Sequence, residues 1–244
     1  MQPWRARWRE LAQGAAALER WLLPAECLLC HEPAGNADPL ICDRCRRRWR
    51  PVLAPWCERC GQPARDALPC RLCAEWPTAL TRARSAVWLD DGARQAVHAL
   101  KYSGRWRVTV QLAQAMTGLE PLAERVILVP VPLAPKREAV RGYNQAEKLA
   151  RALADRTGHE VAPEALVRRR ETPTQTKLTP ELRRANVGGA FEGEGVRGRR
   201  VVLVDDVLTT GATLGACAEA LVAAGATRVE AVTFARARAV GDFV

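Results

Sequence analysis

The sequence predicts an α/β fold in which a parallel, doubly wound sheet follows a small cysteine-rich module. Three observations predict it. Valine- and leucine-rich segments alternate with helical segments after residue 80, and eight of the nine cysteines form four Cys-x-x-Cys pairs before it. The unbroken apolar run 201–204 ends in two aspartates, as a buried parallel strand does where it reaches a loop. We therefore expect two domains, residues 1–80 and residues 81–244.

The composition is that of a globular protein with a basic excess. The chain has 244 residues, a hydrophobic content of 48% and a formal net charge of +10. No apolar run approaches the roughly 20 residues of a membrane span, and Glu10, Glu19 and Arg20 interrupt any secretory signal. We expect a cytoplasmic protein. In that reducing compartment, paired cysteines indicate metal or redox chemistry rather than disulfides.

Residues 4–23 have the pattern of an amphipathic helix. Apolar residues, among them Trp4, Trp8 and Leu11, recur on one face of such a helix. Two interpretations remain open, namely a helix that packs on its own protein and an anchor on a membrane surface, and we favour the first.

The four Cys-x-x-Cys pairs predict two structural zinc ions. Each pair forms a tight turn with two thiolates on one side, and two such turns complete a tetrahedral site. We expect the first pair to join the second and the third to join the fourth. Such a site has no open coordination position, so it stabilises or recognises rather than catalyses. The predicted metal ligands are Cys27, Cys30, Cys42, Cys45, Cys57, Cys60, Cys70 and Cys73.

Other interpretations of the cysteines fit the chain less well. The stretch CLLCH at 27–31 matches a c-type haem attachment motif, but that chemistry requires export. Thioredoxin-like redox chemistry uses one pair beside a βαβ unit, not four pairs in series. His31 could replace a cysteine ligand, although a surface histidine is the simpler account. Cys217 has apolar neighbours at helical spacing and is expected in the core.

Strand and helix signals after residue 80 predict an order of elements. We expect a strand, a turn at 91–92, a helix ended by Gly104, a helix at 109–116, a strand at 125–132, a basic loop at 133–145, a helix at 145–157 ended by Gly158, a polar and basic stretch at 168–191, a strand from 201, a helix at about 213–224 and a strand at 228–236. His98 lies on the first of these helices. There it could serve as an acid or base, but a side chain without a chemical role is the expectation we favour.

The residues after the strand at 201–204 have the chemistry of a sugar phosphate site. Asp205 and Asp206 stand at the carboxyl end of a predicted parallel strand, where open α/β sheets bind ligands. The following turn offers hydroxyls, a glycine and backbone N–H groups at a helix N-terminus, which favours an anion. The residues of this turn are Thr209, Thr210, Gly211, Ala212 and Thr213.

The stretch VVLVDDVLTTGAT at 201–213 resembles, without a gap, the phosphoribosyl pyrophosphate (PRPP) motif of type I phosphoribosyltransferases. The resemblance implies that Asp205 and Asp206 are catalytic residues that hold the ribose hydroxyls, and that residues 209–213 bind the 5′-phosphate. It also implies Mg²⁺ on the pyrophosphate of PRPP. The loop after the first long core strand would bind that pyrophosphate through Lys136, Arg137 and Arg141, a solvated basic loop being the alternative.

The order of motifs along the chain resembles the ComF family of competence proteins. The motifs are the cysteine pairs, LKYSGR at 100–105, VPVPL at 129–133, RGYNQAEKLA at 141–150, QTKLTPELRRANVGGAF at 175–191 and the PRPP motif. The resemblance implies a double zinc ribbon followed by a Rossmann-like type I phosphoribosyltransferase domain. It also implies a role in DNA uptake during natural transformation, and it makes residues 168–186 the counterpart of the flexible loop that closes over PRPP.

Two functions follow from these observations. The first is transfer of a phosphoribosyl group from PRPP to an acceptor that the sequence does not identify. The second is a non-catalytic adaptor that senses PRPP or binds single-stranded DNA and other transformation proteins; a zinc-stabilised scaffold without a ligand is a third possibility. Residues 168–200 carry nine basic and four acidic side chains, which suits pyrophosphate and a nucleic-acid backbone equally. No oligomeric state follows from the sequence.

Overall fold

The computed structural model describes residues 26–34, 40–63, 70, 72–170 and 189–238. By compactness the chain divides into two units, Met1–Arg48 and Trp49–Val244. The helix predicted at 4–23 and residues 171–186 of the predicted closing loop lie outside the described residues.

The described part of the first unit consists of two short turns that carry cysteines. The backbone N–H of Leu28 in the first turn donates to the carbonyl of Leu40, just before the second turn, at 2.9 Å. The second turn continues into helix α2 (Asp43–Arg46), which buries Cys45. A small unit of this kind has little apolar core, so a bound metal would supply much of its folding free energy.

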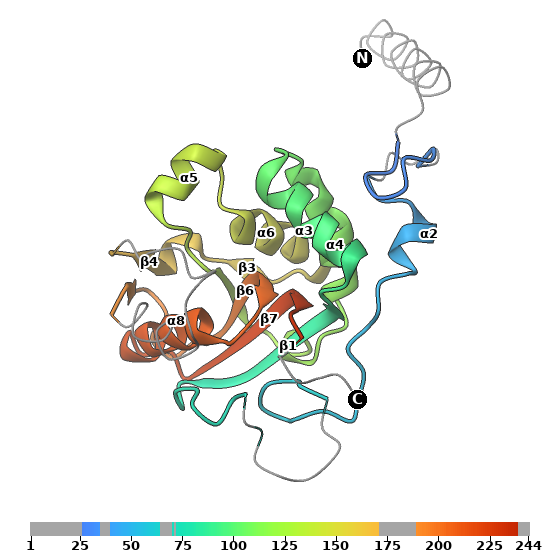
Figure 1. Ribbon diagram of the computed structural model, residues 1–244. Helices are drawn as coiled ribbons and strands as arrows, with labels where there is room; N and C mark the ends of the chain where they lie inside the picture. Colours follow the sequence, from blue (N-terminus) through green and yellow to red (C-terminus); the bar gives the residue numbers. More distant parts are fainter. Residues whose placement is uncertain (1–25, 35–39, 64–69, 71, 171–188, 239–244) are drawn as a thin grey trace, which may run out of the picture. The chain divides into compact units, whose positions relative to one another are not determined.

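The second unit is built on a five-stranded parallel sheet (Figure 1). Its strands are β1 (Leu80–Trp88), β2 (Ile127–Pro130), β3 (Glu160–Val161), β6 (Arg200–Leu208) and β7 (Arg228–Arg236). They lie in the order β1-β7-β6-β2-β3, so β6 is in the middle. The continuous apolar run at 201–204 in β6 and the burial of every residue of β7 after Arg228 suit strands that are covered on both faces. The predicted parallel α/β architecture is confirmed.

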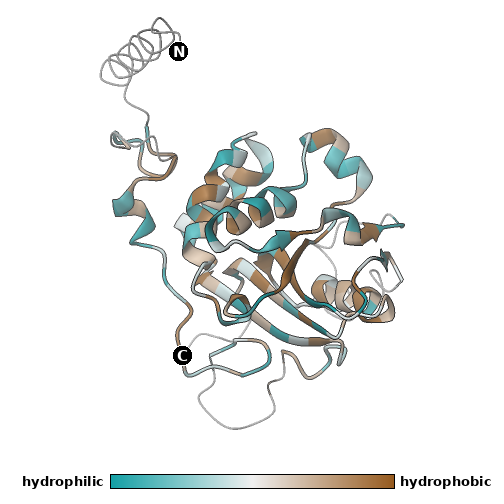
Figure 2. Cartoon of the chain, turned by 180° about the vertical axis from the view of Figure 1, so that it is seen from behind, coloured by the Kyte–Doolittle hydropathy of each residue, from teal (hydrophilic) through white to brown (hydrophobic). Residues whose placement is uncertain are grey.

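Helices cover both faces of this sheet (Figure 1). Helices α3 (Asp91–Tyr102), α4 (Thr109–Met116) and α6 (Gln145–Thr157) lie over one face, and α8 (Ala212–Ala223) packs against the other. Figure 2 shows the hydrophobic residues concentrated on the strands and the hydrophilic residues on much of the helical surface. Among the described residues, no helix combines the length and the apolar composition that a membrane span would need.

Shorter elements connect the helices and strands. They are η1 (Trp106–Val108), η2 (Glu120–Leu122), α5 (Pro135–Arg141), η3 (Pro163–Ala165) and an antiparallel pair formed by β4 (Leu166–Arg168) and β5 (Phe191–Gly193). In the sequence, most of the polar and basic stretch at 168–191 lies between these two short strands. The sequence predicts no regular structure for it.

Capping residues determine where the helices begin and end. At the start of α6, the side chain of Asn144 accepts a hydrogen bond from the N–H of Ala146 at 3.0 Å, and Gly158 ends the helix with a φ of 74°. The bounds predicted for α4, α6 and β7 are confirmed, because their periodicity and caps are local signals.

Two predictions in this region are wrong. Residues 91–92 form the first turn of α3 rather than a separate turn, because the side chain of Asp90 caps the helix by accepting the N–H of Ala93 at 3.0 Å. The segment predicted as a basic loop contains helix α5, which starts at Pro135 and ends at Gly142 in the left-handed region. Proline at the first helical position and glycine after the last are helix signals that the charge pattern concealed.

The second cysteine-rich module packs directly on the sheet within the second unit. Arg236, at the end of β7, is fully buried, and its guanidinium donates to the side chain of Gln62 at 2.8 Å and to the carbonyl of Cys60 at 2.5 Å. The N–H of Ala83 in β1 donates to the carbonyl of Arg59 at 2.8 Å. The domain boundary predicted at residue 80 is drawn from composition and stays a prediction. The division by compactness uses spatial contacts instead and falls after Arg48.

We predict that Arg236→Ala lowers the free energy of unfolding by about 3 kcal/mol, because it leaves the buried acceptors of the cysteine module without their donor. Urea denaturation measures the change. The control is Arg238→Ala, which removes an exposed arginine two residues further along and should change stability by no more than about 0.5 kcal/mol. Equal effects of the two substitutions would contradict the assigned role of Arg236.

Candidate functional site

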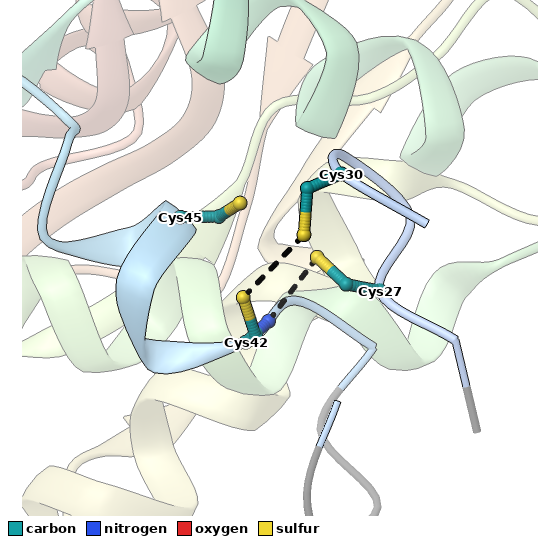
Figure 3. A group of neighbouring side chains, drawn as sticks. All are labelled: Cys27, Cys30, Cys42 and Cys45. Carbon is teal, nitrogen blue, oxygen red and sulfur yellow. Dashed lines mark hydrogen bonds between the residues drawn. The ribbon is translucent and has the colours of Figure 1, made fainter. Parts of the chain in front are cut away.

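The cysteines form two separate groups of four. Figure 3 shows the first group, in which the thiols of Cys27, Cys30, Cys42 and Cys45 point toward one another. The second group consists of Cys57, Cys60, Cys70 and Cys73. Within each group all four sulfur atoms lie within 4.8 Å of one another. The predicted grouping of first with second pair and third with fourth pair is confirmed, and His31 lies outside both groups on the surface.

The surroundings of these thiols fit zinc. The N–H groups of Leu29 and Cys42 each point at the sulfur of Cys27, at 3.4 Å. Burial raises the pKa of this thiol, but these N–H groups, together with the N–H and the thiol of Cys30, outweigh burial and lower the pKa to about 6. Burial and neighbouring thiols raise the pKa of Cys45. Four thiols so close together repel one another when all are ionised, and the positive charge of Zn²⁺ removes that repulsion. The two groups are therefore four-cysteine zinc-binding sites.

A cleft of about 980 Å³ opens at the carboxyl end of β6. It is lined by most of the residues that the sequence singled out, which lie on β6, on the turn after it and on α5: Asp205, Asp206, Thr209, Thr213, Lys136, Arg137 and Arg141. Three other predicted residues, Thr210, Gly211 and Ala212, belong to the same turn but are not among the described residues that line the cleft.

The turn after β6 leads directly into helix α8. Gly211 has a φ of 84°, a left-handed conformation that glycine adopts without strain, and its carbonyl accepts the N–H of Gly215 at 2.8 Å. The hydroxyl of Thr210 accepts the N–H of Ala212 at 3.4 Å. The positive end of the α8 dipole therefore lies beside the cleft, since Thr213 in its first turn lines that cleft.

The two aspartates of the cleft have different surroundings. Asp206 is 2% exposed, and its carboxylate forms an ion pair of 2.5 Å with the ammonium of Lys101 from α3. The amide of Gln145 donates to its other oxygen at 3.5 Å. Burial raises the pKa of Asp206, but Lys101 outweighs burial and lowers it. Burial also lowers the pKa of Lys101, and the two aspartates outweigh burial and raise it.

Asp205 is half-buried, and none of the cations in the described part of the chain forms an ion pair with it. Its carboxylate accepts the backbone N–H of Asp206 at 2.8 Å. Burial and the neighbouring charge of Asp206 raise the pKa of Asp205 well above its usual value. The lowered pKa thus favours the charged form of Asp206, and the raised pKa makes Asp205 the acid of the pair that is protonated more readily.

The segment RGYNQ at 141–145 organises the cleft. Arg141 donates to the side chain of Gln145, which in turn donates to Asp206. The hydroxyl of Tyr143 donates to the carbonyl of Leu100, and the amide of Asn144 donates to the carbonyl of Val131 at 3.0 Å. These bonds join α5, α6 and the ends of α3 and β2 around one site.

The sequence reasoning missed several residues of the cleft. Lys101, Gln145, Arg94 and Arg168 line it but were not among the predicted site residues. A signal for Lys101 existed, since a pair of buried acids needs a cation, but only the fold shows which lysine supplies it. His98 lies exposed on α3 at the edge of the cleft, with its ring 4.9 Å from that of Tyr102, and Cys217 is in the core as expected.

The charge of the cleft favours an anion. Six basic side chains line it, against the two aspartates, and one of the six is already paired with Asp206. Helix α5, which carries three of the six, has no buried residue. The arrangement therefore offers acceptors for hydroxyl groups at one end and several cations for phosphate oxygens beside them.

Two family models match the chain. A double zinc ribbon domain matches residues 18–74, and a phosphoribosyl transferase domain matches residues 139–242. Among curated proteins, DNA utilization protein YhgH of Salmonella typhi is 34% identical over 220 residues, covering 85% of this chain and 95% of that protein. Competence protein ComFC of Bacillus subtilis is 29% identical, covering 82% and 89%. Competence protein F of Haemophilus influenzae is 26% identical, covering 86% and 96%.

Among solved structures, an orotate phosphoribosyltransferase from Aeropyrum pernix matches 61% of this chain and 67% of its own chain. Its identity of 24% and TM-score of 0.31 are too low to carry an argument about this site.

We predict opposite effects of the two isosteric substitutions in the aspartate pair. Asp206→Asn leaves Lys101 without its carboxylate and lowers the free energy of unfolding by about 2 kcal/mol. Asp205→Asn removes a carboxylate whose pKa burial and Asp206 have raised, so it raises the free energy of unfolding. The folded state holds the carboxyl proton of Asp205 more tightly than the unfolded state does. The gain in free energy of unfolding from Asp205→Asn therefore grows as the pH rises from about 4 through the raised pKa.

Denaturation of both variants across this pH range measures these effects, with Asp155→Asn on the exposed side of α6 as the control. If Asp205→Asn were as destabilising as Asp206→Asn, the assignment of distinct roles would be wrong.

Proposed function

The chain belongs to the ComF family, that of the DNA utilization and competence F proteins, and on this premise we propose that it binds PRPP with Mg²⁺ in the cleft at the end of β6 and transfers the phosphoribosyl group to an acceptor. One observation carries the proposal. The aspartate pair and the first turn of α8 line one cleft together with the cations of α5, although α5 lies more than 60 residues earlier in the chain.

The ribose 5-phosphate portion of PRPP matches the β6 side of the cleft. In this proposal the carboxylates of Asp205 and Asp206 accept hydrogen bonds from the ribose hydroxyls. Residues 209–213 hold the 5′-phosphate through backbone N–H groups and hydroxyls, with the α8 dipole favouring its charge. Lys101 keeps Asp206 ionised and oriented, and so keeps one strong acceptor available whatever the state of Asp205.

The pyrophosphate portion matches the basic side of the cleft. Lys136, Arg137 and Arg141 on α5 supply positive charge for its oxygens, and Arg141 is held by its bond to Gln145. The half-buried carboxylate of Asp205 is the kind of oxygen ligand that Mg²⁺ prefers together with substrate phosphates. When bound, the magnesium ion would neutralise charge on the pyrophosphate as it leaves.

Transfer requires that the bond between ribose C1 and the pyrophosphate oxygen breaks while a bond from the acceptor to C1 forms and the acceptor loses a proton. The ribose then carries positive charge as the leaving group departs. The carboxylate of Asp206, fixed by Lys101, is a negative charge that the fold keeps in place beside the sugar. Such fixed charges lower the barrier because they need no reorganisation during the reaction.

Calorimetry with Mg-PRPP tests this proposal. We expect binding by the wild-type chain, and a loss of at least about a hundredfold in affinity for the double variant Asp205→Ala with Asp206→Ala, since two charged acceptors are removed. Asp155→Ala, on the exposed side of α6, is the control and should bind as the wild type does. Pyrophosphate release in the presence of candidate acceptors then tests transfer. Absence of PRPP binding by the wild type would rule out the proposal.

A second candidate function, an adaptor that binds single-stranded DNA, has a specific observation in its favour. Tyr102, which lines the cleft, and Trp106, four residues further along the chain, are 70% and 45% exposed. Each ring has a cation above it, Arg141 at 5.4 Å from the Tyr102 ring and Lys148 at 5.1 Å from the Trp106 ring. Exposed aromatic rings paired with cations can stack on bases and contact phosphates without reading sequence.

Filter binding of a single-stranded oligonucleotide at increasing salt tests this second function. We expect affinity to fall steeply with salt, and Tyr102→Ala with Trp106→Ala to weaken binding by about tenfold at fixed salt. Val110→Ala, which removes an exposed apolar side chain from α4, is the control. DNA binding that persists in the Asp205→Ala, Asp206→Ala variant would separate the two functions. No binding even at low salt would eliminate direct DNA recognition.

A further inference from the structure

The turn between β6 and α8 rests on a tryptophan of the second cysteine module. The indole N–H of Trp76 donates to the backbone carbonyl of Thr210 at 2.8 Å, and Trp76 is only 6% exposed. Its ring also lies against Gly211. A Cβ atom at Gly211 would lie 2.4 Å from Cε2 of the indole, a distance at which the two could not coexist. Trp76 therefore contacts the turn through both a hydrogen bond and close packing.

The position of Trp76 is set by the second zinc-binding site. The N–H of Trp76 donates to the carbonyl of the zinc ligand Cys73 at 3.1 Å. Arg59, which lies between the ligands of the other turn, donates to the carbonyls of Cys73 at 3.1 Å, Trp76 at 3.0 Å and Pro77 at 2.7 Å. Both metal-binding turns thus hold the segment that carries the indole.

A second close contact lies one turn further along α8. A Cβ atom at Gly215 would lie 2.9 Å from Cδ of Pro77. Two glycines of the same helix start therefore face the module with no room for a side chain. The module, the end of β6 and α8 also share one apolar core, which includes Cys60, Cys73 and Leu214. The N-terminus of α8 cannot shift without disturbing the module.

We propose that Trp76 is a positioning residue that couples the second zinc-binding site to the turn at 209–213. In this arrangement the metal-loaded module holds the indole, and the indole fixes the carbonyl of Thr210 and the left-handed backbone of Gly211. The N–H groups of the turn are thereby held in the orientation that binds a phosphate. The proposal deepens the proposed function and rests on it for the identity of the ligand.

Coupling of this kind is reciprocal. If zinc in the second site raises the affinity of the turn for a phosphate ligand, then the bound phosphate ligand must raise the affinity of the second site for zinc by the same factor. If Trp76 only contributed to the core, its replacement would lower stability but would not change the linkage between zinc binding and phosphate binding. The linkage therefore distinguishes a positioning role from a general contribution to the core.

The chain provides a matched control for Trp76. Trp49 is also a buried tryptophan, 7% exposed, and packs edge-on against Phe234 with ring centres 4.9 Å apart. Its indole N–H has no hydrogen-bond partner among the described residues, and within that part of the chain no hydrogen bond or ring contact joins Trp49 to the turn at 209–213. Trp49→Phe and Trp76→Phe both keep an aromatic ring, but only Trp76→Phe removes a hydrogen bond to the turn.

The first experiment measures hydrogen exchange without ligand. We expect Trp76→Phe to accelerate amide exchange at residues 211–213 by about tenfold while α6 is unchanged, and Trp49→Phe to leave residues 211–213 as in the wild type. Zinc content, measured by mass spectrometry, should stay the same in both variants. Unchanged exchange at 211–213 in Trp76→Phe would overturn the inference, whether or not the chain binds PRPP.

The second experiment measures linkage in the full chain carrying Cys27→Ser and Cys30→Ser, so that only the second site holds zinc. In equilibrium competition with a chromogenic chelator, Mg-PRPP should raise the zinc affinity of the second site by about tenfold, and Trp76→Phe should abolish this protection and weaken Mg-PRPP binding by the same factor. Equal protection with and without Trp76 would overturn the inference. If the wild type fails to bind Mg-PRPP but exchange responds to Trp76→Phe, the proposed function fails and the coupling remains.

Discussion

The ion pair between Lys101 and Asp206 is the interaction on which the candidate site depends. Two adjacent carboxylates at the end of a buried strand would repel each other, and the cost of burying Asp206 alone would be several kcal/mol. Lys101 offsets this cost from a helix on one face of the sheet and leaves Asp205 as the acid that faces the cleft with a raised pKa. The site is therefore electrostatically asymmetric before any ligand arrives.

The same end of the sheet is organised by two structures that are not part of the strand. The RGYNQ segment connects the cation-bearing helix α5 to Asp206 through Arg141 and Gln145. On the other side, the second zinc-binding module supports the turn that begins α8 through Trp76. A four-cysteine zinc site has no open coordination position, so it does not act on a substrate through the metal, and contacts of this kind connect it to the cleft.

Electrostatics and geometry together limit what the cleft can bind. The excess of basic side chains favours polyanions, whereas the buried aspartate pair accepts hydroxyl donors and disfavours a bare phosphate chain. PRPP carries both groups in one molecule, and in the proposed function its 5′-phosphate lies on the α8 side and its pyrophosphate on the α5 side. Two exposed aromatic rings, Tyr102 and Trp106, each have a cation above them, and these are the groups on which the second proposed function rests.

The sequence by itself determined the features that depend on neighbours along the chain. The bounds of α4, α6 and β7 and the grouping of the cysteines follow from periodicity, caps and short spacings. The sequence placed Asp205 and Asp206 after the strand, whereas β6 continues through them to Leu208 by pairing with β7. Tertiary structure alone decided that Lys101 pairs with Asp206 and that Trp76 supports Thr210, since these partners lie 105 and 134 residues apart. Such contacts leave no local pattern, because they arise only when the sheet brings distant segments to one edge.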